Sequence, residues 1–190
     1  MSDTYDFIGL DEAGRGAWAG PLVVAAVCLT RPIDGLNDSK LLGPKRRAEL
    51  AAVIKQRADF IGLGVVSPAW LDRRGLTATT SRAMKLALKR APANCPVVID
   101  GPVNYLPKRR HVTTLINADA LLPAVMAASI LAKEHRDQLM RLHAGRWPQY
   151  GFERHVGYGT PAHRHALQRH GPCRLHRLSF RPLKTLALQS

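Results

Sequence analysis

The stretch that decides the fold is Phe7-Ile8-Gly9-Leu10-Asp11-Glu12-Ala13-Gly14-Arg15-Gly16. Its first residues are a short apolar run that predicts a buried strand, and two adjacent carboxylates, Asp11 and Glu12, end that run. Charge at the end of a buried strand is costly unless it is compensated, and a divalent cation is the commonest compensator. Glycines let a backbone approach a ligand closely, and an arginine between them suits a phosphate. The stretch therefore predicts one site for metal and phosphate together.

Outward from this stretch, apolar runs alternate with segments of helical spacing. We expect strands at Tyr5–Leu10, Leu22–Leu29, Phe60–Val66, Pro96–Ile99 and His111–Ile116. We expect helices at Pro44–Asp59, from Ser67-Pro68, at Thr77–Arg90, at Leu121–Leu142 and from Thr160-Pro161 to Gly171-Pro172. Strands and helices that interleave in this way predict an α/β protein with a mixed sheet and helices on its faces. We divide the chain into a core, residues 1–145, and a basic, mainly helical part, residues 146–190, packed on it as one functional domain.

Composition narrows the partners of the chain. The 190 residues carry a net charge of +14, and the 50 residues from Arg141 contain a single acid, Glu153. This imbalance favours a polyanionic partner, most plausibly nucleic acid, over a basic protein that is merely kept in solution by its charge. The three cysteines are far apart, the start of the chain lacks the features of a signal peptide, and no apolar run approaches the roughly 18 residues that span a bilayer. We expect a cytoplasmic protein with no membrane association.

Two further acids fall where apolar segments end. Asp100 follows the run Pro96–Ile99, and Asp119 lies at the expected start of the alanine-rich helix. Each has an ordinary explanation, because Asp100 suits a turn before a glycine and Asp119 suits a helix cap. With Asp11 and Glu12, however, they form a set of four carboxylates, and clustered carboxylates repel one another unless a cation shares the site. Oxygen ligands beside a substrate phosphate favour Mg²⁺ or Mn²⁺, and two such ions ~4 Å apart can serve phosphodiester hydrolysis.

Two other groups are weaker candidates for this chemistry. Cys173 and His176, with His163 and His165, offer soft ligands for zinc, but their spacing matches no standard zinc finger. Asp137, in the expected helix Leu121–Leu142, is expected at the surface in a pair with Arg136 or Arg141. At 1.5 Å per residue it lies about 27 Å along that helix from Asp119, which makes it a poor fifth ligand.

In these and further motifs the chain resembles a known family, ribonuclease HII, which hydrolyses RNA strands in RNA–DNA hybrids and nicks beside single ribonucleotides in duplex DNA. The resemblance covers nearly the whole chain and rests on six blocks in order: Gly9–Gly16, Asn37–Leu41, Ile99–Gly101, Asp119–Pro123 continuing into Ala127–Lys133, Gly157–Thr160, and a tail with Gly171-Pro172 and His176–Phe180. The resemblance implies a ribonuclease H-like mixed sheet flanked by helices, with a basic helical C-terminal extension.

The resemblance also implies roles for individual residues. It assigns the metal ligands to the four acids already singled out, Asp11, Glu12, Asp100 and Asp119. It assigns nucleic-acid contacts to Gly14, Arg15 and Gly16 at the RNA–DNA junction, to Ser39 and Lys40 at backbone phosphates, and to Tyr158 at the deoxyribose after the ribonucleotide. A glycine backbone suits the junction, since the 2′-hydroxyl distinguishes RNA from DNA and only a backbone without side chains approaches it closely.

One departure from the family pattern concerns phosphate binding. The family usually has a lysine before the Gly-Tyr pair, and this chain has Val156 there. Either one phosphate contact is missing, or Arg154 and His155 replace it.

Three functions compete on these grounds. The resemblance implies an endoribonuclease that uses Mn²⁺ or Mg²⁺, with two ions during catalysis, on RNA–DNA hybrids and ribonucleotide-containing duplex DNA, leaving 5′-phosphate and 3′-hydroxyl ends. We expect this enzyme to be a monomer. An apolar strand that ends in Asp-Glu also resembles a Walker B element, but the chain has no GxxxxGK[ST] phosphate loop. The remaining alternative is a nucleic-acid-binding module without catalysis, which leaves four acids that would repel the backbone unexplained.

Overall fold

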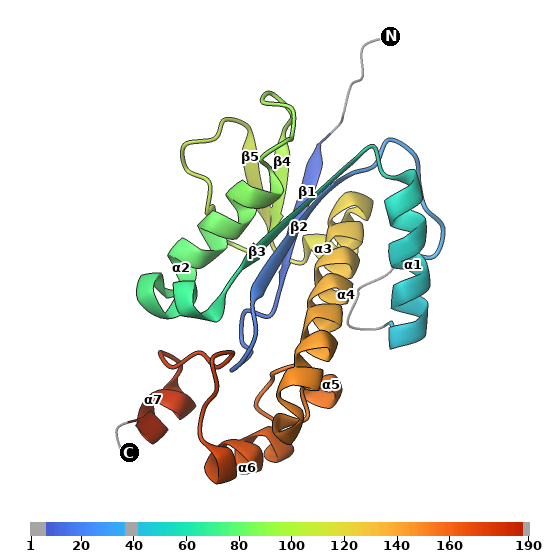
Figure 1. Ribbon diagram of the computed structural model, residues 1–190. Helices are drawn as coiled ribbons and strands as arrows, with labels where there is room; N and C mark the ends of the chain where they lie inside the picture. Colours follow the sequence, from blue (N-terminus) through green and yellow to red (C-terminus); the bar gives the residue numbers. More distant parts are fainter. Residues whose placement is uncertain (1–6, 37–41, 188–190) are drawn as a thin grey trace.

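A computed structural model describes residues 7–36 and 42–187 (Figure 1). Its centre is a five-stranded sheet in the order β3-β2-β1-β4-β5. β1 pairs antiparallel with β2 and β2 antiparallel with β3, whereas β1–β4 and β4–β5 are parallel. The strands are β1 (Ile8–Ala13), β2 (Leu22–Cys28), β3 (Phe60–Val66), β4 (Val97–Asp100) and β5 (Val112–Leu115). The predicted α/β class with a mixed sheet is confirmed.

Proline sets the start of most of the helices. In α1, α2, α4 and α6 it occupies the first turn, where its missing N–H costs nothing. The hydroxyl of Ser67 caps α2 by accepting from the amide of Trp70, at 3.3 Å, and Thr160 caps α6 in the same way. The helical segments are α1 (Pro44–Arg57), α2 (Pro68–Ala87), α3 (Ala118–Leu121), α4 (Pro123–Arg146), the 3₁₀ turn η1 (Pro148–Tyr150), α5 (Phe152–His155), α6 (Pro161–His170) and α7 (Arg181–Ala187).

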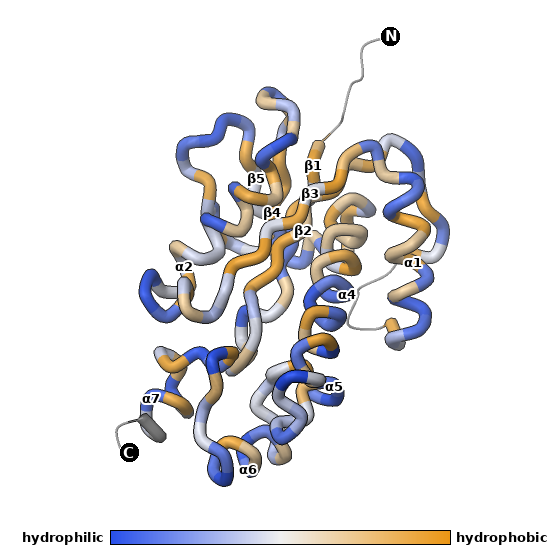
Figure 2. The backbone as a smooth tube through the Cα atoms, viewed as in Figure 1, coloured by the Kyte–Doolittle hydropathy of each residue, from blue (hydrophilic) through white to orange (hydrophobic). Residues whose placement is uncertain are grey.

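Helices cover both faces of the sheet. α2 lies on one face and α1 and α4 on the other (Figure 1). The strands are the most hydrophobic part of the chain (Figure 2), and β2, in the interior of the sheet, is buried along its whole length. α2 approaches β3 so closely that a side chain at Gly64 would collide with the carbonyl oxygen of Ala83. The fold therefore has two apolar layers, one on each side of the sheet.

Two predicted boundaries near the acids are wrong. β1 does not end at Leu10 but continues through Asp11 and Glu12, because its antiparallel pairing with β2 extends to Ala13 while its parallel pairing with β4 stops at Leu10. Asp119 does not open the alanine-rich helix but lies in the separate one-turn helix α3. Leu122 is extended, as the residue before a proline prefers to be, and α4 begins only at Pro123.

The C-terminal part packs against the end of α4 and the loop after β1. Tyr150, Phe152, Leu167 and Leu175 form an apolar cluster with Ala19, Met140 and Ala144. The backbone of this part also joins that loop, since the amide of Gly20 donates to the carbonyl of Leu175 at 2.8 Å. Within residues 7–36 and 42–187, no helix has the length and apolar character needed to cross a membrane.

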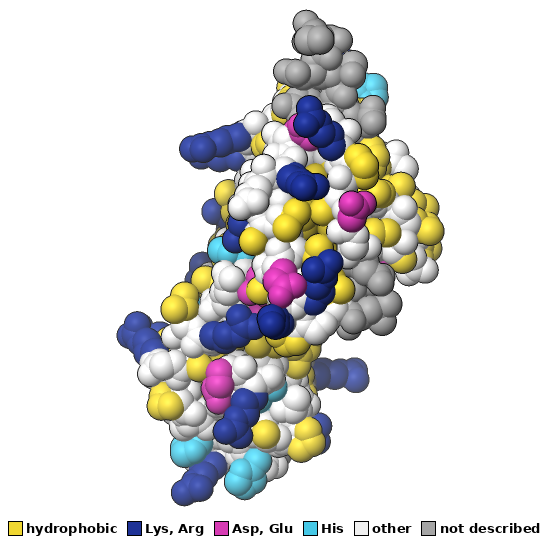
Figure 3. Space-filling view, turned by 90° about the vertical axis from the view of Figure 1, so that its right-hand side faces the viewer, with side chains coloured by type: hydrophobic (Ala, Val, Ile, Leu, Met, Phe, Trp, Pro, Cys, Tyr) yellow, Lys and Arg dark blue, Asp and Glu magenta, His cyan; other side chains and the backbone are white. Residues whose placement is uncertain are grey.

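Basic side chains are widely distributed over the surface. On the face formed by the α1 and α4 side, Lys and Arg are spread from one end to the other while Asp and Glu are few (Figure 3). Nine Lys and Arg residues follow position 140. One of them, Arg177, is fully buried and is therefore not available to a partner.

Candidate active site

Seven of the ten predicted site residues line one cavity of about 260 Å³ at the C-terminal ends of the neighbouring parallel strands β1 and β4. The cavity lies where the parallel strands end, which is where sites gather in open α/β sheets. Its lining contains three of the four predicted acids and the glycine turn: Asp11, Glu12, Ala13, Gly14, Arg15, Gly16, Asp100, Ser129, Lys133 and Tyr158. The sequence did not single out Ser129 or Lys133 as site residues, although both lie in one of the blocks that carried the resemblance.

Of the three remaining predicted residues, the structure describes only Asp119, which is buried, at 5% exposure, and does not line the cavity. Ser39 and Lys40 lie outside the described residues.

Asp11 is a buried acid with a strongly shifted pKa. Burial raises the pKa of its carboxyl to about 8, and the negative charges of Glu12 and Asp100 add to the rise. A hydrogen bond with Ser129 and one from the amide of Glu12, at 2.7 Å, act in the opposite direction without cancelling it. At neutral pH this carboxyl therefore holds a proton that a cation would have to displace.

Two buried arginines donate hydrogen bonds to backbone carbonyls of the turn from Gly14 to Pro21. Arg136, on α4, donates through Nε to the carbonyl of Pro21 at 3.1 Å and through Nη2 to that of Ala19 at 3.0 Å. Gly14 has a φ of 90° and lies directly against the Arg136 side chain, so no larger residue fits there. The glycine predicted for close approach to a ligand is thus also required for close packing inside the protein.

Arg177 holds the same turn from the C-terminal part. Its Nε and Nη2 donate to the carbonyl of Gly20 at 3.0 and 2.9 Å, and its Nη1 donates to the carbonyl of Arg15 at 3.1 Å. Burial, followed by the nearby charge of Arg136, lowers the pKa of this guanidinium to about 9. In the sequence, this residue stands out only as one of the basic residues that follow Arg141.

Tyr158 enters the cavity from the C-terminal part. Its ring lies 5.7 Å from Nζ of Lys133 and 5.3 Å from the guanidinium carbon of Arg136, so two cations of α4 face it. The preceding residues bind the turn after β1, because the carbonyl of Gly157 accepts from the amides of Trp18 and Ala19 at 2.9 and 3.1 Å. Packing between distant segments therefore places Tyr158 beside the glycine turn.

The donor set suits a hard divalent cation in kind. Asp11, Glu12 and Asp100 offer only oxygen atoms, and the negative charges of Glu12 and Asp100 add to the effect of burial in raising the pKa of Asp11, a contribution that a cation would relieve. As placed, no three His, Cys, Asp or Glu side chains in the described ranges stand close enough together to hold an ion. The carboxylates are thus gathered at one cavity but not drawn into a coordination sphere.

The histidines that suggested zinc interact with one another and with the backbone instead. Nε2 of His163 lies 3.0 Å from Nε2 of His176, and Nδ1 of His163 lies 2.9 Å from the carbonyl oxygen of Tyr158. The amide of Cys173 donates to Nδ1 of His176 at 2.9 Å. Burial lowers the pKa of both rings to about 4, so the pair is neutral at physiological pH.

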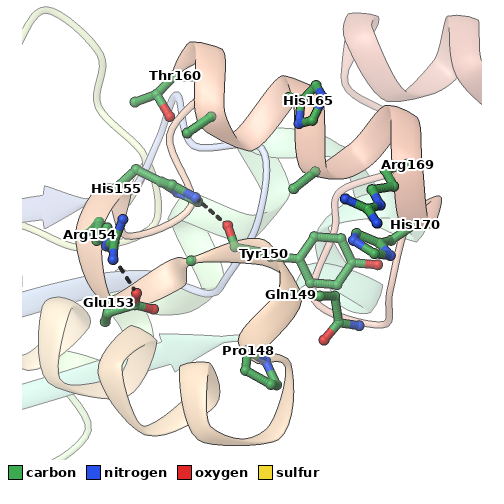
Figure 4. Close-up of a pocket in the computed structure, with 13 residues that line it drawn as sticks. Pro148, Gln149, Tyr150, Glu153, Arg154, His155, Thr160, His165, Arg169 and His170 are labelled. Carbon is green, nitrogen blue, oxygen red and sulfur yellow. Dashed lines mark hydrogen bonds and ion pairs between the residues drawn. The ribbon is translucent and has the colours of Figure 1, made fainter.

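A larger cavity, about 610 Å³, lies in the C-terminal part and is lined by Arg154 and His155, the two possible replacements for the missing lysine, but by none of the predicted acids and not by the glycine turn or Tyr158. In Figure 4, His165, Arg169 and His170 of α6 face Tyr150 across it, and Arg154 pairs with Glu153 at 3.5 Å. His155 contacts the carbonyl of Tyr150 at 2.7 Å instead of pointing into solvent. The walls of this larger cavity are basic, but they lack the acids that line the smaller cavity.

Comparison with known proteins agrees with this architecture. The ribonuclease H2 of Pyrococcus horikoshii superimposes with a TM-score of 0.80 over 96% of this chain and 97% of that one, at 23% identity. The ribonuclease HII of Archaeoglobus fulgidus, solved in a complex with PCNA, gives 0.76 over 91% and 94%, at 27% identity. A ribonuclease HIII solved with Mn²⁺ gives 0.69 over 98% of this chain and 71% of that one, at 25% identity. The fold is that of the ribonuclease H-like nucleases.

Sequence comparison defines the family more closely. The sequence model of the family described as ribonuclease HII matches residues 8–183. A ribonuclease HII of Novosphingobium aromaticivorans is 46% identical over 95% of this chain and 98% of its own length. One of Bordetella pertussis is 47% identical over 93% of this chain and 89% of its own. The chain belongs to the ribonuclease HII family.

Proposed function

We propose that this chain is a divalent-metal-dependent endoribonuclease that hydrolyses the RNA strand of RNA–DNA hybrids and nicks 5′ to single ribonucleotides in duplex DNA. One observation carries the proposal: Asp11, Glu12 and Asp100 share a cavity with the glycine turn and with Tyr158. The proposed metal ligands thus lie beside the residues proposed to recognise the substrate. A binding module alone would gain nothing from three acids facing a phosphate backbone.

Asp11, Glu12, Asp100 and Asp119 are the proposed catalytic acids and metal ligands. The ions are Mn²⁺ or Mg²⁺, with two present during catalysis, and the Mn²⁺ complex of a ribonuclease HIII of the same fold supports this choice. When bound, such ions supply an activated water and stabilise the leaving oxygen, giving 5′-phosphate and 3′-hydroxyl ends. The protein itself provides negative charge at the C-terminal ends of β1 and β4, and the Asp11 carboxyl gives up its proton when a cation binds.

Substrate recognition falls to the residues around these acids. The backbone of Gly14, Arg15 and Gly16 would contact the 2′-hydroxyl at the RNA–DNA junction, since hydrogen bonds to that group distinguish RNA from DNA. Tyr158 would pack on the following deoxyribose, where a 2′-hydroxyl would crowd the ring. Ser39 and Lys40 would bind backbone phosphate.

The two parts of the chain would act as one unit. Residues 146–190 supply Tyr158 and, through Arg177, support for the glycine turn, while residues 1–145 supply the acids. Both contributions meet at the same cavity, which favours a single functional domain over two separable ones. We propose that this unit works as a monomer in the cytoplasm.

Cleavage of a labelled duplex that contains one ribonucleotide tests the proposal. With Mn²⁺ or Mg²⁺ we expect one cut, 5′ to the ribonucleotide, and an upstream product whose 3′-hydroxyl a polymerase extends. An all-DNA duplex of the same sequence is the control and remains intact. Cleavage only within runs of several ribonucleotides would refute the junction role of the glycine turn and Tyr158. Binding without cleavage in either metal would favour the non-catalytic module.

A further inference from the structure

A buried network of charges connects α1 to the middle of α4. Arg47, Glu134 and Asp137 are 6%, 4% and 3% exposed. Nη2 of Arg47 donates to a carboxylate oxygen of Asp137 at 3.2 Å, and Nε of Arg47 lies 3.6 Å from Glu134. Asp137 is therefore not the surface acid that the sequence suggested, and one of its cationic partners, Arg47 on α1, is 90 residues away.

The network reaches the catalytic cavity through Lys133. Nζ of Lys133 donates to the other carboxylate oxygen of Asp137 at 2.8 Å, one helical turn away. Lys133 is partly exposed, lines the cavity with Asp11, Glu12 and Asp100, and faces the ring of Tyr158. At the opposite end of the network, Arg141 pairs with Glu134 at 3.6 Å and does not line the cavity.

Buried ion pairs of this kind are poor sources of stability, because the cost of removing charges from water often exceeds their attraction. A positional role explains the network better. A lysine is a point charge on a flexible four-carbon stem, and Lys133 stands beside three carboxylates. Without Asp137, the attraction of those carboxylates would draw the ammonium group onto them.

We propose that Asp137 and Arg47 are positioning residues that hold the Lys133 ammonium group away from the catalytic acids. Asp137 engages Lys133 directly, and Arg47 fixes the carboxylate that does so. The held ammonium group leaves the acids open to divalent cations and faces the incoming strand, where it binds a backbone phosphate beside Tyr158. The inference rests on the proposed function, because it needs the cavity to receive both ions and nucleic acid.

Binding measurements on Asp137→Asn, Lys133→Met and the double variant test the proposal without relying on cleavage. For Asp137→Asn we expect Mn²⁺ affinity, measured by calorimetry, to fall about tenfold, the equivalent of ~1.4 kcal/mol, because the released ammonium competes for the carboxylates. Lys133→Met keeps the Mn²⁺ affinity of the wild type. This variant should bind a ribonucleotide-containing duplex more weakly in Ca²⁺. The slope of the logarithm of its duplex affinity against the logarithm of salt concentration should decrease by about one, as expected for the loss of one phosphate contact.

The double variant gives the decisive comparison. Removing Lys133 in the Asp137→Asn background should restore Mn²⁺ affinity to within about twofold of the wild type, because the competing charge is gone. Arg141→Met, which removes a cation from the far end of the same network, is the matched control and keeps both affinities. Unchanged Mn²⁺ binding in Asp137→Asn, or no recovery in the double variant, would overturn the proposal.

Two features keep the test independent of folding and of the proposed reaction. If Asp137→Asn fails to fold, Lys133→Met can still refute the proposal, because unaltered duplex affinity and salt dependence in that variant would remove the phosphate role for which Lys133 is positioned. If the wild type binds Mn²⁺ and duplex but cleaves nothing, the proposed function fails while the binding results still support or refute the role of Asp137.

Discussion

Asp11→Asn is expected to abolish cleavage while it stabilises the fold. Asparagine has the shape of aspartate but cannot supply the negative charge that holds a cation, so the cleavage rate should fall by at least ~10³-fold. Duplex binding in Ca²⁺ should persist, because the basic surface and Tyr158 are untouched. The free energy of unfolding should rise, since a carboxyl whose pKa burial has raised to about 8 is replaced by a group that never ionises.

The stability gain should depend on pH in a defined direction. The Asp11 carboxyl binds its proton more tightly in the folded state than in the unfolded state, so its contribution is greatest below pH ~4 and is lost as the pH rises to about 8. In chelator, the wild type should therefore lose stability relative to Asp11→Asn across that interval. Denaturant titrations at several pH values measure this difference. A constant difference, or cleavage close to that of the wild type, would contradict the assignment of Asp11.

Arg177→Met is expected to damage the site from a distance. The substitution leaves the carbonyls of Gly20 and Arg15 without their buried donors, which should cost about 2–4 kcal/mol of stability and lower the melting temperature by roughly 5–10 °C. Cleavage should fall at least tenfold even well below the melting temperature, because the glycine turn loses its support. Thermal unfolding and steady-state cleavage of the same preparations measure both effects.

A neighbouring arginine provides the control. Arg174 is exposed and belongs to the same segment, so Arg174→Met removes one positive charge without removing a buried contact. It should keep the melting temperature and lose only a little duplex affinity, as expected for one phosphate contact or none. If Arg177→Met matched Arg174→Met in both measurements, the buried arginine would have no supporting role.

Local signals in the sequence were sufficient for much of the fold. β3 has the predicted limits of Phe60–Val66, and β2 ends one residue earlier than predicted. The helices that begin at Pro68 and Pro161 were also predicted, because proline and a preceding cap mark a helix start within a few residues, and the helix at Pro44 was predicted from its helical spacing. What the sequence did not predict depends on pairing between distant segments. The extension of β1 through Asp11 requires β2 as a partner, and the apolar periodicity along β1 does not indicate that pairing.

The candidate site divides in the same way. Adjacent acids after an apolar run pointed to Asp11 and Glu12, and the structure places them with Asp100 in one cavity. Nothing local revealed that Arg136 and Arg177 are buried, since their partners are backbone carbonyls 115 to 162 residues away. Basic residues are usually exposed, so the surface interpretation was the natural one. Groups that support a site from other elements become visible only when the chain is folded.

We propose that the carboxylate cavity is the metal centre of a nuclease. Anomalous scattering from crystals grown with Mn²⁺ tests this assignment most directly, because the ion is located without reference to activity. We expect Mn²⁺ peaks in the cavity between Asp11, Glu12 and Asp100. Mn²⁺ bound only at the His163–His176 pair, or no peak in the cavity at saturating Mn²⁺, would contradict it.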